Sequence, residues 1–156
     1  MNYNFKCDYY IMTGQKYSFS IKSLINILFK HNLKLMFLIR ITANKNTIFS
    51  KLIRCYIYLF KRKYGIDMHP DTKIGPGLAL SHAYNITINP GAIIGKNVFI
   101  GINSTVVGKI HIGDNVLIAP NSFVNMDIPS NSIVLGNPCK VIPKTDATKG
   151  YIGFLV

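Results

Sequence analysis

The sequence predicts a mainly β fold: a parallel β-helix of hexapeptide repeats, preceded by a small α-helical N-terminal domain. Aliphatic residues recur every six positions through the second half of the chain. The first half shows helical periodicity and carries nearly all of the positive charge. These observations divide the 156 residues into a helical region 1–65, a repeat domain 66–142 and a C-terminal tail 143–156.

The net charge of +12 is concentrated in the helical region. Residues 1–65 contain twelve basic residues and one acid, Asp8, whereas residues 66–156 have a net charge of +1. We expect the basic side chains to form solvated faces of helices that pack on the repeat domain. The alternative is that these helices lie on an anionic lipid surface as a peripheral membrane contact. No recognised nucleic-acid-binding module accompanies the charge, so no nucleic-acid partner is predicted.

Two helices are expected in this region. Ser20 can cap the first, and a break is expected at residues 31–32 before the helix resumes. The second begins at Thr47 and ends at Gly65, which serves as the C-cap. Basic residues interrupt both segments, so neither has the run of about 18 apolar residues that a membrane span requires. The apolar stripe of the first helix consists of Ile21, Leu24, Ile25 and Leu28.

The three cysteines, Cys7, Cys55 and Cys139, are odd in number and widely spaced. Their spacing does not match a zinc site, and the N-terminus does not read as a cleavable signal peptide. These features predict reduced thiols and a cytoplasmic location.

The repeat is strict over six hexads, whose aliphatic residues are Ile94, Ile100, Val106, Ile112, Ile118 and Val124. A small or branched residue follows each of them by four positions: Val98, Ser104, Ile110, Val116, Ser122 and Ile128. A period of six fits neither an α-helix nor an alternating strand. Each hexad is predicted to form one short strand and a turn, and three hexads form one coil that stacks on its neighbours.

The repeat is interrupted near its beginning. An earlier series also has a period of six: Met68, Ile74, Leu80 and Ile86. The later series extrapolates back to Ile88 instead of Ile86, which predicts two inserted residues near positions 84–89. An irregularity in a regular solenoid changes the direction in which the nearby side chains point, and such irregularities are common at functional sites. Because this one lies close to His82, we expect the chemistry of the protein there.

At this point the residues resemble hexapeptide-repeat acyltransferases, in particular serine acetyltransferases and the related O-acetyltransferases of capsule and polysaccharide loci. The segments that carry the resemblance are 65–70 (GIDMHP), 74–78 (IGPGL), 80–88 (LSHAYNITI), 112–116 (IGDNV) and 136–142 (GNPCKVI). The resemblance implies a left-handed parallel β-helix that transfers acetyl from acetyl-CoA to a hydroxyl without a metal. It also implies a homotrimer or a dimer of trimers, with sites at the subunit interfaces.

The resemblance further assigns residues to the site. His82 matches the general base that takes the proton of the acceptor hydroxyl. Asp67 matches an acidic residue that orients this base or binds the acceptor. The residues that match or neighbour the CoA-binding positions are Ala119, Lys140, Asn103 and Ser104. A cation at Lys140 suits the phosphates of CoA.

The sequence also departs from the family. Ser81 replaces the acid that precedes the catalytic histidine, and about one coil with a projecting loop is missing between Val98 and Phe99. The expected acceptor is L-serine, with a hydroxyl of a sugar or capsular polysaccharide as the alternative. A catalytically inactive, shortened paralogue acting as a structural or binding subunit remains open. A metal-dependent hydratase would need more convergent histidines than His82 and His111. The tail is expected to leave the helix and pack across a neighbouring subunit.

Overall fold

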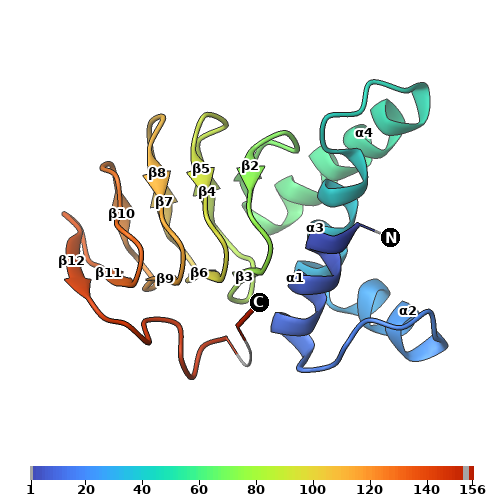
Figure 1. Cartoon of the computed structure of the whole chain (residues 1–156). Helices are drawn as coiled ribbons and strands as arrows, with labels where there is room; N and C mark the ends of the chain where they lie inside the picture. The colour runs from blue at the N-terminus through green and yellow to red at the C-terminus, as the bar shows by residue number, and fades with distance from the viewer. Residues whose placement is uncertain (1, 153–154) are drawn as a thin grey trace.

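The computed structural model describes residues 2–152 and 155–156 (Figure 1). Four helices come first: α1 (Tyr3–Thr13), α2 (Ile21–Phe29), α3 (His31–Thr42) and α4 (Ile48–Tyr64). The strands that follow are β1 (Asp67–Met68), β2 (Lys73–Ile74), β3 (Leu78–Leu80), β4 (Thr87–Ile88), β5 (Ile93–Ile94), β6 (Val98–Ile100), β7 (Thr105–Val106), β8 (His111–Ile112), β9 (Val116–Ile118), β10 (Phe123–Val124), β11 (Ser132–Leu135) and β12 (Lys140–Pro143). None of the described helices is long and apolar enough to cross a membrane.

The strands form the three faces of a β-solenoid. Their orders are β1-β4-β7-β10, β2-β5-β8 and β3-β6-β9-β11-β12. Neighbouring strands are parallel, except that β12 is antiparallel to β11. Figure 1 shows the coils stacked from β2 and β3, beside the helices, to β12 at the far end. The predicted solenoid with a helical N-terminal region is therefore confirmed.

The interior consists of the two predicted sets of residues. The six aliphatic residues of the strict hexads are each 2% exposed or less, and the six residues that follow them by four positions are all buried. Ile88, Val106 and Val124 stack in register on successive coils. No coil buries its own interior, so the apolar column forms only when the coils stack.

The first coil is longer than the next two. Met68 pairs with Ile88, twenty positions later, whereas Ile88 pairs with Val106, eighteen positions later. Leu80 pairs with Ile100, which is also twenty positions later, whereas the pairs that begin in β4 are eighteen positions apart. The two extra residues therefore lie after Leu80 and before β4. The prediction of a two-residue insertion is confirmed. In the structure the insertion lies closer to Leu80 than the predicted positions 84–89.

Asparagines at the solenoid corners locate the insertion more closely. Asn85, Asn103 and Asn121 recur every eighteen positions, and all three adopt a positive φ, which asparagine tolerates better than most residues. The amide N–H of Asn103 donates to the Tyr84 carbonyl, and that of Asn121 to Ile102, both at 3.1 Å. Because Asn85 already occupies the regular corner, the extra residues belong to 81–84. The six-residue period alone could not show this.

The predicted helix boundaries largely agree with the structure. The Ser20 side chain accepts from the Ser23 amide, and Thr47 with Ser50 forms a capping box. Gly65 ends α4 in the left-handed conformation. The break falls at Lys30, one position before the expected site. Helix α1 was not predicted, since its buried residues Phe5, Cys7, Tyr9 and Ile11 alternate along the chain and show no helical stripe.

The orientation expected for α2 is wrong. Its apolar stripe faces away from the protein, and the residues that α2 buries are Ser23 and Ile27. Helix α3 instead contributes Leu35, Met36 and Ile39 to the solenoid core. An amphipathic pattern identifies an apolar face, but a competing helix with more apolar residues can occupy the packing surface.

A buried ion pair joins the helices to the first coil. The Arg40 guanidinium of α3 donates to the Asp8 carboxylate of α1 at 2.8 and 3.1 Å. The same carboxylate accepts the amides of Gly77 and Leu78, both at 3.0 Å. Burial raises the pKa of Asp8, while Arg40 and the two amides oppose this rise. Every charge and amide in this cluster has a partner, so the cluster fixes how α1 and α3 meet the solenoid.

The tail leaves the coils after β12, which ends at Pro143. It returns along the corners of its own solenoid towards α1 (Figure 1). Asn115 receives the Thr148 hydroxyl at 2.6 Å and donates to the Thr145 carbonyl at 2.5 Å. At the first coils, Asn97 exchanges two hydrogen bonds with the backbone of Val156, at 2.7 and 2.8 Å. Asn115 and Asn97, at two corners of the solenoid, thus supply side-chain partners for the backbone of the tail.

A second ion pair attaches α4 to the loop between β1 and β2, and it makes stability depend on pH. Arg54 donates to the Asp71 carboxylate at 2.6 and 2.9 Å, which lowers the pKa of Asp71. A lowered pKa in the folded state stabilises the protein above the unfolded value of about 3.9, and this contribution is lost as pH falls below it.

Asp71→Asn is therefore expected to lower the free energy of unfolding at pH 7 by at most about 1 kcal/mol, because the pair is partly exposed. Urea unfolding at pH 7 and at about pH 3 measures the effect, which should be smaller in acid. An equal difference between variant and wild type at both pH values would contradict this role.

Candidate functional site

The insertion at 81–84 forms a bulge between β3 and β4, at the end of the solenoid next to the helices. His82 and Ala83 have φ values of 54° and 45°. Such values are uncommon for residues other than glycine and persist only where the surroundings hold them. The Ala83 side chain is buried, and His82 is exposed. The bulge therefore turns the His82 imidazole outward from an otherwise regular coil.

Two helix ends hold the bulge in place. His31, the first residue of α3, donates from Nε2 to the carbonyl oxygen of His82. The His31 ring stacks on Tyr64, the last residue of α4, with a centroid separation of 4.6 Å and an interplanar angle of 7°. It also contacts Tyr84 of the bulge, at 5.0 Å. Asn32 donates to the Leu80 carbonyl at 3.4 Å. The helical region thus positions the backbone that carries His82.

His82 borders a hollow of about 480 Å³ between the helices, the first two coils and the tail. The apolar part of its wall includes Ile11, Phe29 and Phe99. The lining residues that can carry charge or donate a hydrogen bond from the side chain are Lys30, His31, Asn32, Ser81, His82 and Tyr151. Within the described part of the chain, no carboxylate lines this hollow. A ligand there meets positive charge and hydrogen-bond donors.

Asp67 lies apart from this hollow. It begins β1, its side chain is largely exposed, and its carboxylate is 3.4 Å from Nζ of Lys61. Among the described residues, Asp67 makes no hydrogen bond to His82. Within a single chain, then, the two residues predicted to be catalytic do not form a hydrogen-bonded pair.

The residues predicted to face the cofactor lie on later coils. Asn103 is exposed at its corner and donates to Asn121 at 2.6 Å. Ser104 is fully buried, and its hydroxyl donates to the Ala119 carbonyl at 3.0 Å inside the coil. Ala119 itself is partly exposed, directly after β9, and Lys140 is exposed at the start of β12. Since neighbouring strands of a face are about 4.8 Å apart and β12 lies four strands from β3, these positions extend along the solenoid from the His82 bulge for roughly 19 Å.

The structure places His82 and His111 on different coils, in the bulge and in β8. Over residues 2–152 and 155–156, no group of three or more His, Cys, Asp or Glu side chains is arranged to hold a metal ion.

Lys30 and His31 were not predicted as site residues. They are 52 and 51 positions before His82, and nothing in the local pattern connects them with the bulge. The only signal at this point of the sequence was the expected helix break. Their proximity to His82 follows from the packing of α3 on the first coil.

The comparisons agree with this architecture. Residues 91–125 match the family described as bacterial transferase hexapeptide (six repeats). Serine acetyltransferase 2 of Arabidopsis thaliana is 33% identical over 125 residues, which cover 56% of this chain. The match spans only 39% of the length of that plant protein.

Solved structures extend the similarity to the helical region. Serine acetyltransferase of Neisseria gonorrhoeae in complex with serine gives a TM-score of 0.64 at 22% identity, over 89% of this chain and 67% of that one. A serine acetyltransferase in complex with CoA gives 0.64 at 21% identity, over 89% and 68%. Likeness at these identities establishes the fold. Residues 91–125 thus match the hexapeptide repeat, and the chain as a whole is similar to serine acetyltransferases in sequence and in fold.

Proposed function

We propose that the chain is an acetyl-CoA-dependent O-acetyltransferase in which His82 is the general base. The observation that carries the proposal is the bulge at 81–84, the point where the first coil departs from the regular repeat and presents an imidazole beside a ligand-sized hollow. The relatives named serine acetyltransferases, and the similar structures with CoA or serine, support the same reaction.

The chemistry follows from what an imidazole can do near neutral pH. His82 removes the proton of the acceptor hydroxyl as the oxygen attacks the thioester carbonyl of acetyl-CoA. The C–S bond then breaks, and the imidazolium returns the proton to the departing CoA thiolate. The ester and free CoA are the products. General-base help of this kind contributes typically about 10²–10⁴-fold in rate.

The exposed positions along the later coils are proposed to contact CoA. Asn103 and the backbone near Ala119 border the path of the pantetheine arm, and Lys140 offers a cation to the phosphates. Ser104 contributes by fixing the Ala119 carbonyl, since its hydroxyl is buried and donates to that oxygen. In a homotrimer or dimer of trimers, these faces would meet a neighbouring subunit, and the exposed Asp67 would be free to bind the acceptor or orient a base across the interface.

L-serine is the acceptor that the relatives support. A sugar hydroxyl is the second candidate, and one observation favours it: Ser81 stands beside His82, and the described wall of the hollow has no carboxylate to bind a substrate ammonium group. A neutral or anionic sugar has no ammonium group and therefore needs no carboxylate in the wall of the hollow.

Release of free CoA from acetyl-CoA tests the proposal. The purified protein is assayed with L-serine and, separately, with a panel of neutral and acidic sugars. Serine-dependent release supports the first acceptor, and release with a sugar alone assigns the protein to carbohydrate acetylation. No turnover with any acceptor would overturn the proposed activity and favour a structural or binding subunit.

His31 should act as a positioning residue for His82. His31→Phe keeps a ring to stack on Tyr64 but loses the N–H that holds the His82 carbonyl, so kcat is expected to fall by about 10- to 100-fold. His31→Gln keeps a donor and should retain more activity than the phenylalanine variant. Thermal unfolding is measured for both variants. Wild-type kcat in His31→Phe would contradict the positioning role.

A further inference from the structure

The outward face of α2 is apolar. Ile21, Leu24, Ile25 and Leu28 are 79%, 57%, 48% and 52% exposed, and each lies three or four positions from two of the others, which places them on one face of the helix. Phe19, just before the helix, and Phe29, at its end, are exposed as well. Isolated exposed apolar residues are ordinary, but a continuous stripe along a helix indicates an interaction surface.

A second apolar face lies on α4. Ile48, Phe49, Leu52 and Leu59 are 82%, 71%, 66% and 61% exposed, again at helical spacing. The opposite side of α4 buries Ile57 against the rest of the protein. Both helices pack on α3 and lie at the end of the molecule away from β12 (Figure 1). The exposed apolar side chains are therefore gathered at one end of the protein.

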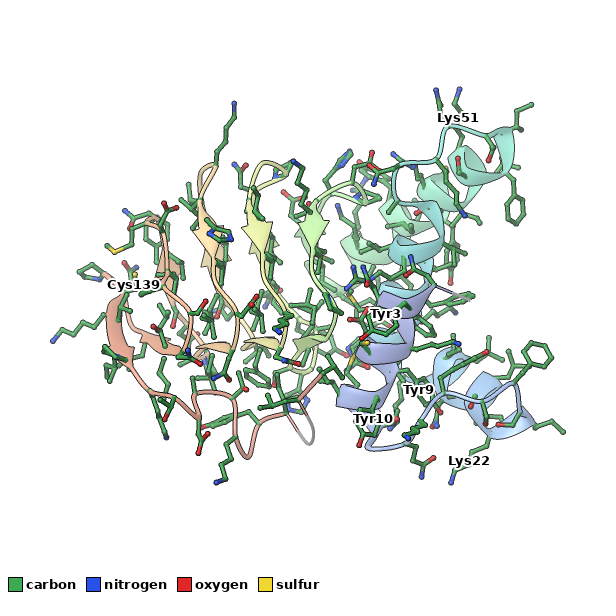
Figure 2. The ribbon with its side chains drawn as sticks, viewed as in Figure 1. Tyr3, Tyr9, Tyr10, Lys22, Lys51 and Cys139 are labelled. Atoms are coloured by element: carbon green, nitrogen blue, oxygen red, sulfur yellow. The ribbon has the colours of Figure 1, made fainter. Side chains whose placement is uncertain are left out.

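The charge at this end has one sign. Residues 1–65 contain twelve basic residues and a single acid, Asp8, which is completely buried against Arg40. The carboxylates nearest to α4 are Asp67 and Asp71, which already pair with basic side chains of the helix. Figure 2 shows Lys22 on α2 and Lys51 on α4 at the helical end of the molecule, far from Cys139. The surface of the helices combines exposed apolar stripes with unneutralised cations.

A hollow of about 710 Å³ adjoins the stripe of α2. Its wall is mostly apolar and includes Tyr17, Phe19, Leu24 and Phe37, with Lys6 also lining it. An acyl chain fits the chemistry of this wall, and Lys6 suits the phosphate of the same lipid.

We infer that α2 and α4 bind the surface of an anionic lipid bilayer, as a peripheral contact that leaves the solenoid in water. Apolar side chains at a helix face enter the boundary between headgroups and acyl chains, and lysines bind the anionic headgroups. A second copy of the chain complements this face less well, because it would bring an equally basic surface against the first one.

Sedimentation with vesicles tests the inference on the full chain. The vesicles consist of phosphatidylcholine alone or of phosphatidylcholine with about one third phosphatidylglycerol, in buffer of about 0.1 M salt. The protein should partition at least about tenfold more strongly onto the anionic vesicles, and a higher salt concentration should weaken the binding. Failure of the wild-type protein to sediment with anionic vesicles would overturn the inference.

Two sets of variants separate the apolar contribution from the charge. Ile25→Glu with Leu28→Glu removes the α2 stripe, and Lys22→Glu with Lys51→Glu reverses two charges. Each pair is expected to lower partitioning by about tenfold or more. Ile142→Glu, at an exposed apolar position of β12, is the matched control and should bind as wild type does.

The size of each variant in solution is measured by analytical ultracentrifugation in the absence of lipid. An unchanged size together with lost vesicle binding supports the bilayer contact. If the α2 variants instead reduce the size of the oligomer and retain vesicle binding, the face joins copies of the chain, and the inference is wrong. An equal loss in Ile142→Glu would also overturn it.

Discussion

Replacing His82 by alanine is expected to lower acetyl transfer by about 10²–10⁴-fold, with the solenoid intact. The imidazole is exposed on the bulge, and no described side chain hydrogen-bonds to it, so its removal leaves no buried partner unsatisfied. The hydrogen bond that fixes the bulge is donated by His31 to the backbone carbonyl of residue 82, which the variant retains. Turnover is measured as release of CoA from acetyl-CoA with the acceptor that the wild-type protein uses.

His111→Ala is the matched control for this experiment. His111 is also exposed, but it lies in β8 on the third coil, away from the hollow. Its variant should keep wild-type turnover, and both variants should keep the wild-type circular dichroism spectrum. Undiminished turnover in His82→Ala would remove His82 from the mechanism, whatever the reaction is.

Replacing Arg40 by methionine should destabilise the protein by about 3–5 kcal/mol, because it leaves the buried Asp8 carboxylate without its cation. Methionine fills part of the volume but cannot donate to Asp8 or to the carbonyls of Ile74 and Gly75, which Arg40 contacts at 2.6 Å. Domains of this size are stable by about 5–15 kcal/mol, so the variant should remain measurable by urea unfolding.

Arg54→Met provides the comparison for Arg40→Met. The Arg54–Asp71 pair is partly exposed, and its loss should change the free energy of unfolding by about 1 kcal/mol or less. Asp8→Asn should also be costly, since the amides of Gly77 and Leu78 lose a charged acceptor. A cost below about 1 kcal/mol for Arg40→Met would show that the cluster is not what attaches the helices to the first coil.

Much of the architecture could be predicted from the sequence because the residues that determine it are close together in the chain or recur at a fixed interval. The hexad at Ile94 and its successors predicted the solenoid, since a residue that points inward on one coil must recur at a fixed interval. The caps at Ser20, Thr47 and Gly65 were predicted for a similar reason, because each satisfies backbone groups only a few positions away.

Other features depend on partners far apart in the chain. Asp8 and Arg40 are 32 positions apart, and each looks like an ordinary surface charge until α1 and α3 pack on the first coil. His31 reaches His82 across 51 positions. The eighteen-residue recurrence of Asn85, Asn103 and Asn121 is the one periodic signal that sequence reasoning could have used to place the bulge more closely.

By itself, the sequence determined that this protein is a hexapeptide solenoid behind a basic helical region, interrupted close to His82. Periodicity carries that information, because repetition along the chain becomes stacking in space. Only the tertiary structure decided which face of α2 is buried, where the tail runs and which groups surround the imidazole. Each of these depends on competition among segments for the same packing surface, and the free energy of that competition is a property of the assembled core.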